Sequence, residues 1–75
     1  MKSIPIGRLG LILAGPERGR IMEVLDDSER TGGFLVVTYS DFSRSPEVFD
    51  VWFESYNDLV AGFEEAGWQV EWQPS

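Results

Sequence analysis

The sequence has no cysteine and no histidine among its 75 residues. Without thiols there is no disulfide and no thiolate zinc site, and without imidazoles there is no Ser-His-Asp centre and no histidine base. Long apolar runs are missing as well, since the longest, Leu9–Ala14, is far too short to cross a bilayer. Residues 1–7 also lack the apolar core of a secretory signal. We therefore expect a cytoplasmic protein, and we expect no cofactor.

Basic residues are few, and all of them lie in the first part of the chain. The six lysines and arginines fall within residues 1–44, where six acidic residues balance them. Residues 45–75 carry the other seven of the thirteen acidic residues and no base, so the net charge of −7 belongs to this half. Such a charge disfavours direct nucleic-acid binding and favours a basic protein partner. The alternative is that the acids only keep a small domain soluble.

Aromatic residues show the same division. The ten Phe, Tyr and Trp residues all follow position 33. A chain this short buries only about 60% of the surface that it exposes when unfolded, so its tryptophans are hard to hide completely. Some aromatic surface should therefore remain exposed among the carboxylates.

Hydrophobic periodicity predicts five strands and one helix. Alternating apolar residues, β-branched content and flanking turn residues indicate strands at residues 8–14, 20–26, 34–40, 48–53 and 68–72. Before the last strand, a helical period predicts a helix that begins after an N-cap at Ser55 and ends at Gly67. The sequence therefore predicts one α+β domain over residues 1–75. It consists of an antiparallel four-stranded meander, an amphipathic helix packed on the sheet, and a short C-terminal strand.

The alternation also predicts which side chains the helix covers. In the fourth strand, Trp52 shares a face with Asp50 rather than with Phe53, so we expect Trp52 to be the exposed tryptophan. We expect the core between sheet and helix to contain Leu11, Val24, Val36, Phe53, Leu59, Phe63, Trp68 and Val70. Gly62 lies within the helix, which indicates either a close approach of helix to sheet or a tolerated defect.

Two loops suggest chemistry, and neither has a complete motif. Asp26, Asp27 and Glu29 could together hold a hard cation such as Ca²⁺, but their spacing differs from that of an EF-hand, so we expect a solvated turn. Residues 15–20 are glycine-containing like a phosphate loop, but they lack its Gly-Lys-Ser/Thr ending and lead into a strand. An enzyme is therefore the least favoured class of function.

The remaining constellation mixes acids with large aromatics in the C-terminal part of the chain. Aromatic anchors ringed by charge are typical of protein–protein interfaces. We therefore predict a non-enzymatic partner-binding surface that contains Asp50, Trp52, Glu54, Asp58, Glu65, Glu71 and Trp72. The rival hypothesis is a small regulatory or accessory domain that self-associates through an unpaired edge of the first or the last strand. Both a monomer and a homodimer therefore stay open.

Four segments carry a resemblance. Residues 19–27 (GRIMEVLDD), 31–37 (TGGFLVV), 49–52 (FDVW) and 65–72 (EAGWQVEW) are similar to stretches of small acidic hypothetical proteins of actinobacterial type. In size and character the chain thereby resembles immunity proteins of bacterial polymorphic toxin systems. The resemblance implies a cytosolic antidote that masks a toxin by direct binding. The acidic charge of residues 45–75 adds the expectation that this toxin is basic, for example one of the nuclease type with a basic cleft. The resemblance assigns no individual binding residue. From the charge and the short apolar runs we expect no direct contact with nucleic acid and none with a membrane.

Overall fold

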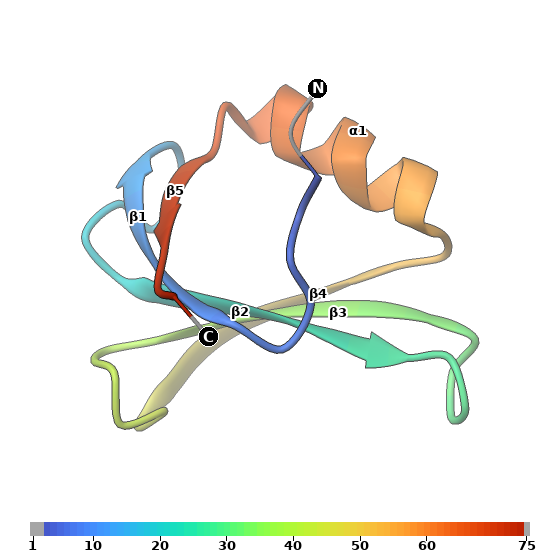
Figure 1. Cartoon of the computed structure of the whole chain (residues 1–75), viewed down its shortest axis with the longest axis horizontal. Helices are drawn as coiled ribbons and strands as arrows, with labels where there is room; N and C mark the ends of the chain where they lie inside the picture. The colour runs from blue at the N-terminus through green and yellow to red at the C-terminus, as the bar shows by residue number, and fades with distance from the viewer. Residues whose placement is uncertain (1–2, 75) are drawn as a thin grey trace.

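The computed structural model describes residues 3–74 and has an α+β fold, with one helix packed on an antiparallel sheet (Figure 1). The elements follow the predicted order: β1 (Leu9–Ala14), β2 (Ile21–Asp27), β3 (Gly33–Tyr39), β4 (Glu47–Phe53), α1 (Tyr56–Ala66) and β5 (Gln69–Trp72). Their ends agree closely with the predicted ones because glycines and short polar loops separate the apolar runs. The predicted fold class is confirmed.

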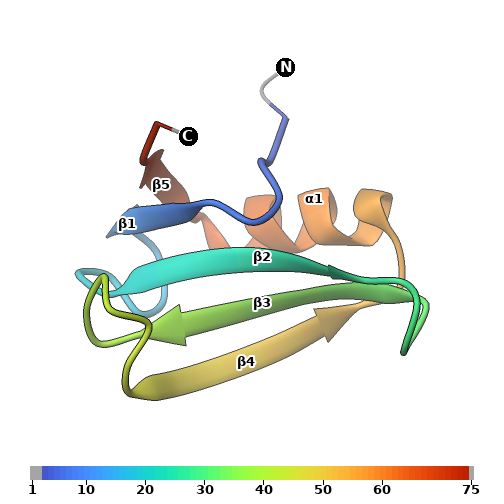
Figure 2. The same cartoon turned by 60° about the horizontal axis from the view of Figure 1, so that its bottom comes forward.

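The strand order of the sheet is β4-β3-β2-β1-β5, and all neighbouring strands are antiparallel. The helix α1 leaves the end of β4 and carries the chain across the concave face, so that β5 joins the sheet beside β1 (Figures 1 and 2). β3 is interior, and the middle position of the sheet belongs to β2. β4 and β5 form the two edges. The first strand is therefore interior, and the edge that the self-association hypothesis considered there does not exist.

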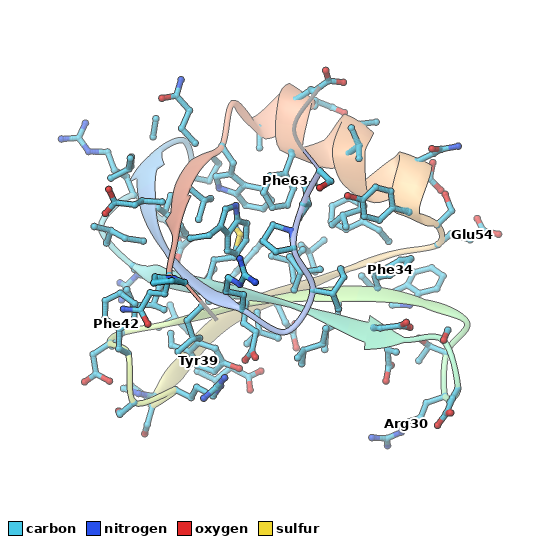
Figure 3. All side chains as sticks on the ribbon, viewed as in Figure 1. Arg30, Phe34, Tyr39, Phe42, Glu54 and Phe63 are labelled. Atoms are coloured by element: carbon cyan, nitrogen blue, oxygen red, sulfur yellow. The ribbon has the colours of Figure 1, made fainter. Side chains whose placement is uncertain are left out.

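The core lies between the sheet and α1. Leu59 and Phe63 of the helix form one buried cluster with Met22 and Val24 of β2 and Val36 of β3. Figure 3 shows the Phe63 side chain on the side of the helix that faces the sheet. Phe63 also packs edge-on against the Trp68 ring, at 5.0 Å between centroids. The half-buried residues packed around this core include the predicted members Phe53, Trp68 and Val70.

The prediction for Leu11 is wrong. Leu11 pairs with Ile21 across the β1–β2 ladder, and both belong to a second apolar cluster on the face that the helix does not cover. The neighbouring residue, Ile12, takes the place in the helix-side core and is almost completely buried. Both faces of β1 are apolar, because the strand is interior and each face has something to pack against. Alternation alone therefore could not assign its faces.

The ends of the helix match their sequence signals. The Ser55 hydroxyl accepts a hydrogen bond from the backbone N–H of Asp58 at 3.1 Å, as an N-cap does. Gly67 ends the helix in the left-handed conformation, with φ of 72°. Gly62 marks a close approach to the sheet, since a β-carbon there would lie 2.6 Å from Cζ of Phe53.

The segment before β1 closes one side of the core. It runs from the helix to the sheet in Figure 1. The backbone N–H of Ile4 donates to the Tyr56 hydroxyl at 2.6 Å, and that hydroxyl donates back to the Ile4 carbonyl at 3.2 Å. Gly7 N–H then bonds to the carbonyl of Val24.

Among the described residues, no helix has the length and apolar character that crossing a bilayer requires.

Candidate functional site

Trp52 lies on the outer strand β4, on the face of the sheet opposite α1. Its cross-strand neighbour is Leu35 of β3, which in turn pairs with Leu25 of β2, so the three side chains form one apolar row across three strands. The two leucines are half-buried, whereas the Trp52 side chain is 45% exposed. The prediction that Trp52 is an exposed tryptophan is confirmed.

The indole of Trp52 is exposed but held in place. Its Nε1–H donates to the Thr31 hydroxyl oxygen at 2.8 Å, and that hydroxyl donates to the Asp27 carboxylate at 3.0 Å. The ring also lies against Gly33 at the start of β3, where a β-carbon would stand 2.6 Å from Nε1. An aromatic anchor that is fixed before binding loses little side-chain entropy when a partner covers it.

Acidic side chains flank Trp52 along the chain. Asp50 lies two residues before it on the same strand face, opposite Val37, and Glu54 follows the end of β4. Both are exposed. We call these three residues, Asp50, Trp52 and Glu54, the β4 surface. Arg30 of the β2–β3 loop lies at the same end of the molecule as Glu54, but Figure 3 shows the two side chains well apart.

The predicted binding residues do not all come together. Asp58 is exposed in the first turn of α1, close in the chain to the β4 surface. Glu65 lies near the far end of α1, and Glu71 and Trp72 lie in β5, at the opposite edge of the sheet. The charge that is continuous in the sequence is thus divided in space between two edges.

Trp72 differs from Trp52 in its surroundings. It is half-buried on the helix side of the sheet, where its ring stacks on Phe63 with centroids 6.5 Å apart. Gly10 of β1 leaves room for it, because a β-carbon there would come 2.7 Å from Cε3 of the indole. Much of the Trp72 ring therefore packs against the body of the protein.

An ionic cluster around a buried carboxylate lies on the same face of the sheet as Trp52, and it was not among the residues predicted from the sequence. Glu23 is 5% exposed between Ile21 and Leu25, whereas the side chain of its ion-pair partner, Arg44, is 51% exposed. Arg44, from the β3–β4 loop, donates to its two carboxylate oxygens from Nε at 2.9 Å and from Nη2 at 3.1 Å. The Tyr39 hydroxyl donates a third hydrogen bond, at 3.2 Å.

The pKa values in this cluster follow from burial and charge. Burial raises the pKa of the Tyr39 phenol, and the adjacent Glu23 carboxylate raises it further. The hydrogen bonds and charge of Glu23 raise the pKa of the Arg44 guanidinium. With three donors already on its oxygens, Glu23 is suited to hold the β3–β4 loop on the sheet rather than to take a proton from a substrate. The sequence did contain a sign of this cluster, because Glu23 shares its strand face with two apolar residues, Ile21 and Leu25.

The acidic β2–β3 loop is a hydrogen-bonded turn. Asp26 accepts from the backbone N–H of Ser28 at 2.9 Å, and this bond lowers the pKa of the Asp26 carboxyl. Asp27 is engaged with Thr31, as described above. In residues 3–74, no three acidic side chains come together in a way that could hold a metal ion. The Gly15–Arg20 loop is likewise a turn between β1 and β2, with an ion pair of 3.2 Å between Glu17 and Arg20.

Comparisons of the chain with protein-family models, with curated proteins and with solved structures gave no match.

Proposed function

We propose that this chain is a non-enzymatic protein-binding domain that masks a basic partner with its β4 surface. The observation that carries the proposal is Trp52, a large aromatic side chain that is 45% exposed and yet fixed by Thr31 and Gly33. Interfaces use such rigid aromatic anchors as their centres of binding energy. The flanking carboxylates of Asp50 and Glu54 would attract a cationic surface and speed its association.

The resemblance to immunity proteins fits this proposal. An antidote of that kind would act in the cytoplasm, where it would cover the basic cleft of a nuclease-type toxin. An acidic, pre-formed surface suits that task, because it both steers association and occludes the cleft. The proposal makes no use of a cofactor or of a catalytic group.

Charge reversal at the two edges of the sheet tests the proposal. A partner is captured from lysate of the source cell with the wild-type domain, identified, purified, and measured by biolayer interferometry. The double variant Asp50→Lys, Glu54→Lys should slow association at least about tenfold, and more salt should reduce that difference. The matched control, Glu65→Lys with Glu71→Lys, makes the same change of net charge at the other edge and should leave binding nearly unchanged.

Two results of these measurements would contradict the proposed function. If both double variants slow association equally, only the net charge matters and the β4 surface is not the contact. If no basic protein is retained, the masking function is rejected.

A second candidate function has one observation in its favour. The edge strand β4 is 7 residues long and exposes Val48 and Phe49 as well as Trp52, which is the kind of edge on which two copies of a chain could pair. Sedimentation equilibrium distinguishes this regulatory or accessory role. The regulatory or accessory role requires that the chain form a dimer without any other partner. Substitutions in β4 should weaken this dimer, and added salt should not.

A further inference from the structure

We infer that the partner contributes an extended segment with alternating basic and apolar residues, which pairs with β4 as an additional strand of the sheet. The inference rests on the proposed function and specifies how the β4 surface is used. Addition of a strand to an exposed sheet edge is a general mode of peptide recognition, in which main-chain hydrogen bonds supply affinity and alternate side chains supply specificity.

The backbone on the outer side of β4 is unpaired. Within residues 3–74, β4 pairs with β3 alone, so alternate N–H and C=O groups along its outer side have no strand partner. The other edge strand, β5, has 4 residues against the 7 of β4. The longer template is therefore on the side of Trp52.

Most of β4 is a regular strand onto which another strand could pair. The pairing of β3 with β4 is irregular only at the Tyr39 end, and it runs in simple register from Phe49 to Phe53. This segment carries no lysine and no proline, and its one charged residue, Asp50, would repel an acidic strand but attract a basic one. The part of β4 around Trp52 is thus open to a further strand.

The two faces of the sheet differ in chemistry at β4. On one face an added strand would lie beside Asp50 and Trp52, where an arginine can pair with the carboxylate and place its guanidinium on the exposed indole. On the other face it would lie beside Phe49 and Phe53, which call for apolar side chains. Because side chains alternate along a strand, these faces select an alternating basic and apolar sequence.

The same charges argue against a second copy as the occupant. Two β4 edges brought together would place Glu47, Asp50 and Glu54 of one copy beside the same three acids of the other. Like charges across a strand pair are destabilising, and the chain already carries a net charge of −7. A basic segment gains from the charges that a second copy would have to overcome.

A designed peptide tests the inference without knowledge of the natural partner. The probe is Ac-Arg-Val-Arg-Val-Arg-Val-Arg-NH₂, which matches the 7-residue length of β4. Two further peptides carry N-methyl groups, one on the valine amides and one on the arginine amides. In an added strand, one set of amides faces β4 and the other faces solvent.

Binding is measured by titration of the ¹⁵N-labelled domain at low salt. The parent peptide should shift the Trp52 indole N–H resonance and slow hydrogen exchange at β4 amides that face away from β3. One methylated peptide should bind at least about tenfold more weakly than the parent, and the other should bind within about twofold. Asp50→Lys with Glu54→Lys should weaken the parent peptide, whereas Glu65→Lys with Glu71→Lys should not.

Each contrary result has its own meaning. If both methylated peptides bind like the parent, the contact is made by side chains alone, and strand addition is rejected while the masking function stands. If the parent peptide does not bind, strand addition is also rejected, and the masking function is judged by its own partner. If the free domain sediments as a dimer with protected β4 amides, the occupant is a second copy and the inference is wrong.

Discussion

The ring of Phe53, at the end of β4, fills the space in which a β-carbon of Gly62 would stand. Cζ of the ring would lie 2.6 Å from that carbon, well inside van der Waals contact. The glycine is therefore a packing requirement at the crossing of α1 over the sheet. Glycine within a helix costs about 1 kcal/mol relative to alanine, so close packing here outweighs helix propensity.

Gly62→Ala should reduce stability despite its better helix propensity. We expect a net loss of about 1 kcal/mol, because the added methyl forces the Phe53 ring out of place. In a Phe53→Leu background, the same substitution should become neutral or stabilising, since the clash is gone. Urea unfolding of the four proteins in this cycle provides the measurement. An increase in stability in the wild-type background would contradict the packing argument.

Ser55 supports the first turn of α1 through its hydroxyl. Ser55→Ala should cost about 1 kcal/mol, because the N–H of Asp58 loses its acceptor, and Ser55→Gly should cost only a few tenths. Thermal melts of the two variants compare these costs. Equal losses would mean that the serine hydroxyl is not what caps the helix.

The Glu23–Arg44 pair should matter more for the charge that it leaves behind than for the bond itself. Arg44→Ala leaves the buried Glu23 carboxylate with Tyr39 as its remaining side-chain donor, and we therefore expect a measurable loss of stability. Arg44→Lys keeps the charge and should lose less. Adding Glu23→Gln to Arg44→Ala should recover part of the loss, which urea unfolding would detect. No recovery would show that Arg44 acts only through loop packing.

Stability should fall in alkaline solution through Tyr39. Because the folded state raises the pKa of its phenol above the usual value of about 10, the folded protein holds this proton more tightly than the unfolded chain. The contribution is complete below that pH and is lost as the pH rises through the folded-state pKa. The stability advantage of the wild type over Tyr39→Phe should therefore shrink with rising pH. Urea unfolding of both proteins at successive alkaline pH values provides the measurement. A difference in unfolding free energy that does not change with pH would refute this linkage.

Thr31 should affect the mobility of Trp52 more than the stability of the fold. Thr31→Val removes the acceptor of the indole N–H at an exposed site, so the change in unfolding free energy should stay within about 0.5 kcal/mol. The Trp52 indole resonance should nevertheless shift and show faster motion, and dissociation of a bound partner should quicken. Thr31→Ser keeps the hydroxyl and is the control. If the serine variant behaves like valine, the hydrogen bond is not what holds the ring.

Local patterns made the elements predictable. In β4, the acid Asp50 marks the face that points away from the helix, and Trp52 shares that face; in β2, Val24 lies on the face opposite Glu23, toward the helix. The helix ends follow from the chemistry of Ser55 and Gly67. In each case the physical cause acts over a few residues, so the sequence shows it directly.

Relations between distant residues could not be predicted in the same way. The position of β5 beside β1 depends on where α1 delivers the chain, and it decides that Glu71 lies far from Asp50. Arg44 is separated from Glu23 by 21 residues and comes from a loop, so no pattern connects the two. Charge that is continuous along a chain need not be continuous on a surface, because the sheet order redistributes it.

The place of β1 between β2 and β5 has a consequence for synthesis on the ribosome. The strand that covers the outer side of β1, Gln69–Trp72, emerges from the ribosome more than fifty residues after β1 itself. Until then, a nascent chain exposes the Gly10–Ile12 backbone as an open edge. Ribosome-bound chains that stop before Gln69 should therefore aggregate more readily than chains whose Gln69–Trp72 segment has left the exit tunnel, because that segment closes this edge of β1.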